Sequence, residues 1–145
     1  MRNQILALSH GTLADGMKVS IRVITGEQNA IDSICVMEKD SPATVTSEIR
    51  DWLDKQNKNI PAIIVTDIPF GSTTTLAAPL LAEYENLKLV SGMNLGMMLA
   101  LVTSDLTAGD IVVKIQDILQ QSKDTIFYVN DQLNQNEGTD AEEDF

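Results

Sequence analysis

Residues 4–11 read Gln-Ile-Leu-Ala-Leu-Ser-His-Gly, a short and nearly continuous apolar run that ends in polar residues. Such a run is typical of a β-strand that is buried on both of its faces. The period of the pattern changes immediately afterwards. Apolar side chains then recur at spacings of four, four and three residues, in Leu13, Met17, Ile21 and Ile24. Because this spacing places them on one stripe of a helix, the sequence predicts a buried strand followed directly by an amphipathic helix.

The same alternation continues along the chain. Further apolar runs of strand length lie at residues 31–37, 61–67 and 87–90. Segments with a helical pattern lie at residues 41–53, 76–84, 94–102 and 110–119, and a candidate for a last strand lies at residues 125–129. Because strands joined by helical crossovers run parallel, we expect an open, doubly wound α/β fold. Its sheet should be mainly parallel, with helices on both faces.

The length of 145 residues corresponds to about one domain. We assign residues 1–131 to that domain. Residues 132–145 are polar and acidic and contain no basic residue, so we expect them to form a disordered tail. No apolar run approaches the roughly 20 residues that a bilayer requires, and the first residues lack the form of a signal peptide. The expected location is therefore cytoplasmic.

Composition also argues against several classes of function. A formal net charge of -11 is unsuited to nucleic acid, whose phosphates require a basic face. The single cysteine cannot form a disulfide within one chain, and with a single histidine it leaves little for a transition-metal site. Glycine-rich nucleotide-binding loops are missing as well. We therefore expect no metal and no cofactor.

Two residues that can carry chemistry fall at predicted strand ends. The carboxyl ends of parallel strands meet at one edge of the sheet, where the ligands of such folds bind. The first strand ends at His10, the only histidine, and the third ends at Asp67. A neutral imidazole is nucleophilic near pH 7, and a carboxylate on its other nitrogen fixes the tautomer. We predict that His10 and Asp67 are a catalytic pair that accepts a phosphoryl group, the alternative being a partly exposed loop histidine.

Glycine and hydroxyl residues stand beside this pair in the sequence. Gly11 leaves the ring of His10 uncrowded on one side, and residues 71–75, Gly-Ser-Thr-Thr-Thr, open the helix that follows Asp67. A helix N-terminus attracts anions through its unpaired N–H groups and its partial positive charge. Taken alone, these hydroxyl residues would be ordinary N-caps. Next to the histidine, the residues that we expect to bind the phosphoryl group are Gly11, Gly71, Ser72 and Thr73.

Several short motifs run in a fixed order through residues 1–130. They are Ile-Leu-Ala-Leu-Ser-His-Gly at 5–11, Asp-Gly-Met at 15–17, Thr-Asp at 66–67 with Gly-Ser at 71–72, and Val-Ser-Gly-Met-Asn-Leu at 90–95 with Met-Met-Leu at 97–99. Together they resemble the IIA component of the mannose-family sugar phosphotransferase system. The resemblance implies a phosphotransferase that works through a phosphohistidine.

The resemblance also implies partners and roles. His10 would be phosphorylated by the histidine phosphocarrier protein HPr and would pass the group to the cognate IIB component, which serves the membrane components IIC and IID. Asp67 would orient the imidazole, and Ser72 with nearby backbone amides would contact the phosphoryl group. Members of the family are homodimers that exchange a terminal antiparallel strand, which would be residues 125–129 here.

The chain departs from the family pattern at two turns. The family's Gly-Gly-Ser-Pro reads Phe-Gly-Ser-Thr at residues 70–73, and its Asn-Leu-Pro reads Asn-Leu-Gly at residues 94–96. Both turns lie beside the predicted site, so they bear on partner fit and sugar class. Three alternatives stay open: the phosphotransfer subunit of a dihydroxyacetone kinase, a regulatory module that senses phosphorylation, and an unrelated flavodoxin-like domain.

Overall fold

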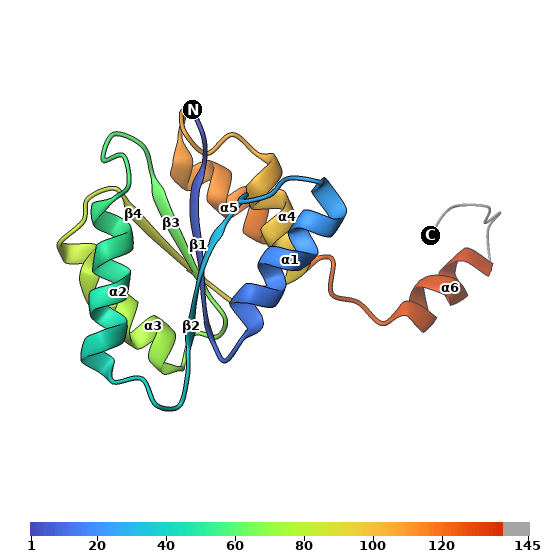
Figure 1. Ribbon diagram of the computed structural model, residues 1–145. Helices are drawn as coiled ribbons and strands as arrows, with labels where there is room; N and C mark the ends of the chain where they lie inside the picture. Colours follow the sequence, from blue (N-terminus) through green and yellow to red (C-terminus); the bar gives the residue numbers. More distant parts are fainter. Residues whose placement is uncertain (138–145) are drawn as a thin grey trace.

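The computed structural model describes residues 1–137 and contains a parallel four-stranded sheet in that part of the chain. The strands are β1 (Gln4–His10), β2 (Asp32–Val36), β3 (Ala62–Thr66) and β4 (Leu87–Ser91), in the order β2-β1-β3-β4 (Figure 1). Leu8 of β1 is paired with Thr66 of β3, and Thr66 with Ser91 of β4. The carboxyl ends of the two central strands therefore lie next to each other at one edge of the sheet.

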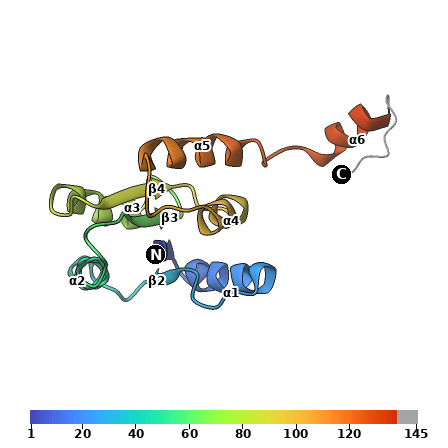
Figure 2. The same ribbon diagram turned by 90° about the horizontal axis from the view of Figure 1, so that it is seen from above.

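Helices cover both faces of the sheet, as Figure 2 shows. One face carries α1 (Leu13–Thr25), α4 (Leu95–Thr103) and α5 (Ile111–Lys123). The other carries α2 (Pro42–Asp54), α3 (Ser72–Ala77) and the 3₁₀ helix η1 (Ala78–Ala82). The predicted open α/β fold with a parallel sheet and helices on both faces is confirmed.

The alternation of side chains along β1 explains this two-sided core. Ile5 and Ala7 are buried against the layer of α1, α4 and α5, whereas Leu6 and Leu8 are buried against α2 and α3. A strand with apolar residues on both sides can be stable only between two helical layers. The run at residues 4–11 thus sits at the centre of the molecule, and its last residues are held by a rigid frame.

The helices begin where the sequence provides caps. Ser41 Oγ accepts a hydrogen bond from the backbone N–H of Thr44 at 3.1 Å, ahead of a proline at the first position of α2. Asn94 Oδ1 accepts one from the N–H of Met97 at 2.8 Å and so starts α4. Each cap satisfies an N–H that has no partner within its helix. No helix among residues 1–137 is long and apolar enough to cross a membrane.

The C-terminal part of the chain differs from the sequence-based expectation. Residues 125–128 form no strand in the single chain, and α6 (Val129–Glu137) follows them, away from the sheet (Figures 1 and 2). The strand predicted at residues 125–129 is absent because these residues have no sheet edge beside them to pair with. Residues 132–137 belong to α6 in the structure, and the rest of the expected tail, residues 138–145, lies outside the described residues.

Candidate active site

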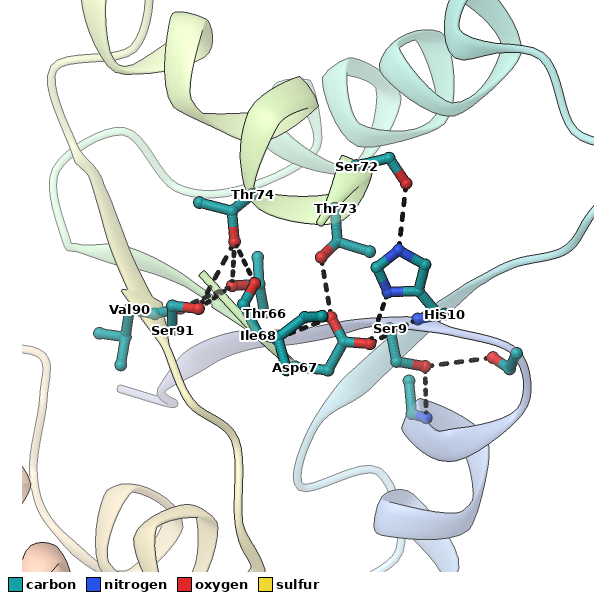
Figure 3. A network of polar contacts seen from close by, with 12 residues as sticks. Ser9, His10, Thr66, Asp67, Ile68, Ser72, Thr73, Thr74, Val90 and Ser91 are labelled. Carbon is teal, nitrogen blue, oxygen red and sulfur yellow. Dashed lines mark hydrogen bonds and ion pairs between the residues drawn. The ribbon is translucent and has the colours of Figure 1, made fainter. Parts of the chain in front are cut away.

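His10 and Asp67 meet at the carboxyl edge of the sheet. His10 is the last residue of β1, and Asp67 directly follows β3. The two strands are neighbours in parallel register, so their ends bring both side chains together (Figure 3). The side chain of His10 is 44% exposed, and that of Asp67 is 10% exposed. The pair therefore consists of an accessible imidazole backed by a nearly buried carboxylate.

One carboxylate oxygen holds His10 at two points. Asp67 Oδ2 lies 2.8 Å from the ring nitrogen Nδ1 of His10 and 2.8 Å from its backbone nitrogen. An ionised carboxylate can only accept hydrogen bonds, so Nδ1 carries the proton of the neutral ring. The other nitrogen, Nε2, is then unprotonated and keeps its lone pair. This is the tautomer that a nucleophilic imidazole requires.

The second oxygen of Asp67 is occupied as well. The hydroxyl of Thr73 donates to Oδ1 at 2.8 Å, and the backbone N–H of Ile68 donates to it at 3.0 Å. Burial raises the pKa of this carboxyl, but hydrogen bonds from His10, Thr73 and Ile68 outweigh burial and lower the pKa from 3.8 to about 2. Asp67 is thus ionised and fixed in orientation at neutral pH.

Gly71 lies directly beneath the imidazole. A Cβ atom added to Gly71 would stand 2.4 Å from Cε1 of His10 and 3.0 Å from Nε2, well inside van der Waals contact. Any side chain at position 71 would therefore collide with the ring. The reason for this glycine is close approach, because its φ of -99° is open to every residue type.

Ser72 stands beside Nε2, the second ring nitrogen of His10. Its Oγ lies 3.2 Å from Nε2 of His10, where the hydroxyl can donate to the lone pair (Figure 3). A hollow of about 450 Å³ opens on this side of the ring, and its lining includes Met37, Glu38 and Asp40 from the loop after β2. An incoming group would reach Nε2 through this hollow and would meet the hydroxyl of Ser72 there.

Two residues expected to bind a phosphoryl group have other partners. The backbone N–H of Gly11 donates to the carbonyl of Val36 at 2.8 Å, and the φ of +61° at Gly11 serves the turn into α1. Thr73 is fully buried, and its hydroxyl is bound to Asp67. Neither the Gly11 amide nor the Thr73 hydroxyl is free for a ligand in this state. Thr73 acts instead on the orientation of the carboxylate.

A cluster of three hydroxyl groups supports the loop between β3 and α3. Thr66 Oγ1 lies 2.7 Å from Oγ1 of Thr74 and 2.7 Å from Oγ of Ser91, and Thr74 donates to the carbonyl of Ile68 at 2.7 Å (Figure 3). The cluster ties the start of α3 to the ends of β3 and β4. Sequence patterns missed this role of Thr66, although a hydroxyl residue ending a run of four buried apolar residues is a usable signal.

The low pKa of Asp67 makes a prediction for stability. We expect Asp67→Asn to lower the free energy of unfolding by roughly 2 kcal/mol at pH 7, because the folded state favours the ionised form. The folded-state pKa of about 2 lies below the ordinary 3.8, so this contribution is complete above about pH 5 and disappears as the pH falls towards 2. Urea unfolding of both proteins at several pH values measures it. A difference that stays constant down to about pH 2 would contradict the assignment.

Fold and site together define a class of protein, an open α/β domain that presents one oriented, accessible imidazole at the carboxyl edge of its sheet. A family model described as "PTS system fructose IIA component" matches residues 4–116. The chain belongs to this family of phosphotransferase system IIA components, and the resemblance to the mannose-family IIA proteins is confirmed. Proteins of this kind are phosphotransfer components of sugar uptake.

Solved structures show the same architecture. The mannose/sorbose-specific IIA subunit from Enterococcus faecalis has a TM-score of 0.79 at 20% identity, over 88% of this chain and 95% of that one. A PTS IIA protein associated with the fucose utilization operon of Streptococcus pneumoniae also has a TM-score of 0.79 at 20% identity, over 92% and 97%. A sigma-54 interaction domain protein from Enterococcus faecalis has 0.71 at 17% identity, over 90% and 96%. At these identities the likeness concerns the fold.

Proposed function

We propose that His10 accepts a phosphoryl group from phosphorylated HPr and passes it to a cognate IIB component, as a step in sugar uptake. The observation that supports this most is the contact between Nδ1 of His10 and Asp67 at 2.8 Å, which leaves Nε2 as the nucleophile. That nitrogen belongs to an accessible side chain next to an open hollow. A protein partner can therefore bring its own histidine to it.

Each transfer exchanges one phosphorus–nitrogen bond for another. The lone pair of Nε2 attacks phosphorus roughly opposite the donor nitrogen, the donor bond breaks, and the donor imidazole keeps the electron pair. Nδ1 of His10 retains its proton throughout, and the positive charge that develops on the ring is offset by the carboxylate of Asp67. Because the two bonds are of the same kind, the step is readily reversible and can run on to IIB.

Ser72 supplies a donor for the phosphoryl oxygens. Its hydroxyl occupies the lone pair of Nε2 at 3.2 Å in the unphosphorylated state. When phosphorus takes that position, the hydroxyl turns to an equatorial oxygen and stabilises its charge. The first N–H groups of α3, which begins at Ser72, have no partner within the helix, and the proposal includes them as further donors. In this proposal Gly71 contributes only by leaving room for the ring of His10.

The remaining partners are proposed by analogy with the family. IIB would deliver the phosphoryl group to a sugar carried by the membrane components IIC and IID. A second copy of the chain would form a homodimer, with residues 125–129 as the exchanged antiparallel strand. Ile126, Phe127 and Tyr128 are exposed in the single chain, which is compatible with such an exchange. The cytoplasmic location stays a prediction.

A label-transfer experiment tests the function. We expect ³²P-labelled HPr to place one acid-labile phosphoryl group on the chain, and we expect addition of a cognate IIB to remove that label within seconds to minutes. Label that stays on the chain would favour a module that senses phosphorylation. Label that moves to a dihydroxyacetone kinase subunit instead of IIB would assign the other pathway. A chain that takes no label from HPr would overturn the proposal.

A further inference from the structure

The side chain of Phe70 is 94% exposed, although it stands next to the reactive histidine. A single exposed apolar side chain is ordinary, but several that gather beside a functional group are typical of a protein–protein interaction site. Ile68 and Met37, from two loops at the same edge of the sheet, are also exposed. We call Met37, Ile68 and Phe70 the apolar rim.

Contacts place the rim around His10. Gly71 follows Phe70 in the chain, and its Cα lies against the imidazole, since an added Cβ would meet Cε1 of His10 at 2.4 Å. The same added Cβ would lie 3.3 Å from Cδ1 of Ile68, so that side chain reaches the glycine as well. Met37 lines the hollow into which the ring opens. The rim residues therefore come from two different loops, and both loops lie beside the imidazole.

The loop that carries Phe70 is held in place. The backbone N–H of Ile68 donates to Asp67 at 3.0 Å, and the carbonyl of Ile68 accepts from Thr74 at 2.7 Å. Pro69 then restricts the backbone torsion just before Phe70. Because hydrogen bonds hold the backbone just before Phe70, binding has to order little more than the side chain of Phe70 itself.

The charge around the rim indicates the kind of partner. Glu38 and Asp40 line the hollow beside His10, with Lys39 between them in sequence, and the whole chain carries a net charge of -11. A partner that brings a histidine to Nε2 must cover the rim, because transfer requires the two imidazoles on either side of one phosphorus atom. An apolar surface with basic residues at its margin is complementary to this edge.

We propose that Phe70, with Ile68 and Met37, is the docking surface for the phosphorylated donor protein, HPr. The apolar surface around the donor's phosphohistidine buries Phe70, and its basic residues face Glu38 and Asp40. This inference rests on the proposed function, because it assigns the donor's binding surface at the same histidine. The family has a glycine at this position of the turn. The docking role would explain why Phe70 replaces it, because the phenyl ring adds apolar contact with the donor.

Two phosphoryl donors of different size test the docking role. Phosphoramidate is a small donor that needs no docking surface, whereas phosphorylated HPr needs one. We expect Phe70→Ser to raise the KM for phosphorylated HPr about tenfold or more with kcat nearly unchanged, and to leave labelling by phosphoramidate at the wild-type rate. Phe70→Leu should recover much of the affinity. The matched control is Val23→Ser, a 77% exposed apolar residue near the far end of α1, which should change neither reaction.

The outcomes separate this inference from the function on which it rests. An unchanged KM for Phe70→Ser, with wild-type protein labelled normally by HPr, would overturn the docking role alone. A parallel loss with phosphoramidate would assign Phe70 to positioning of the ring and would also overturn it. So would a changed molar mass in light scattering, which would mark Phe70 as a contact between copies. Wild-type protein that takes label from phosphoramidate but not from HPr would overturn both proposals.

Discussion

Replacement of His10 by alanine is expected to abolish labelling of the chain by phosphorylated HPr. The sequence contains a single histidine, so no second imidazole can take over the reaction. Hydroxyl groups near the site are un-ionised at neutral pH and are weak nucleophiles by comparison. The measurement is the acid-labile ³²P label per chain after incubation with labelled HPr. We expect about one label per wild-type chain and none on the variant.

Loss of folding would not explain that result. The His10 side chain is 44% exposed and is outside the two buried apolar clusters, so its removal leaves the core intact. His10→Gln is a second variant that keeps a polar side chain of similar reach beside Asp67 and lacks a nucleophilic nitrogen. Circular dichroism should match the wild type for at least one of the two, and the melting temperature should fall only modestly, because Asp67 loses one of its several hydrogen-bond donors. Label on either folded variant would disprove the assignment of His10.

Replacement of Gly71 by alanine is expected to slow phosphoryl transfer by about 100-fold or more. The added Cβ would overlap Cε1 of His10 at 2.4 Å, so the ring must turn or shift. Such a movement breaks the 2.8 Å contact between Nδ1 and Asp67 and takes Nε2 away from Ser72. The backbone itself accepts alanine without strain, because φ at Gly71 is -99°. Steady-state transfer rates from HPr, with thermal unfolding alongside, measure both effects.

Gly16→Ala provides the matched control for this experiment. Gly16 lies inside α1, and an added Cβ would meet nothing within 4 Å. Alanine is favoured over glycine in a helix by up to about 1 kcal/mol, so the variant should be at least as stable as the wild type. Its transfer rate should stay unchanged. Equal rates for Gly71→Ala and wild type would show that the ring does not need the position seen here.

Much of the fold could be predicted because its pattern is local. The apolar run at residues 61–67 and the strand β3 (Ala62–Thr66) differ by one residue at each end. The helix expected at residues 76–84 is in fact split into α3 and η1, and Pro79 stands near the break. Proline has no N–H to donate and so interrupts the regular bonds of an α-helix. The proximity of His10 and Asp67 could be predicted because both lie at the carboxyl ends of strands that were expected to run parallel.

Other parts of the site depend on side-chain directions that a sequence does not show. From the sequence, Thr73 could bind a phosphoryl group or could be a partner of Asp67. Its burial and the 2.8 Å contact of its hydroxyl with Asp67 show that it is a partner of Asp67. The hydroxyl cluster joins Thr66, Thr74 and Ser91, which come from three separate elements. Residues 125–129 have the composition of a strand, but strand formation also needs a free edge within reach.

The double hold of Asp67 on His10 has a consequence for repeated turnover. Oδ2 binds both the backbone nitrogen and Nδ1 of the same residue, so the carboxylate closes a small hydrogen-bonded loop around the χ1 and χ2 torsions of the histidine. The rotational entropy of this side chain is therefore lost once, when the protein folds, and not again in each cycle. A carrier that meets two partners in succession offers both of them the same ring orientation. The side chain of His10 therefore adds no entropy cost of its own when a partner binds.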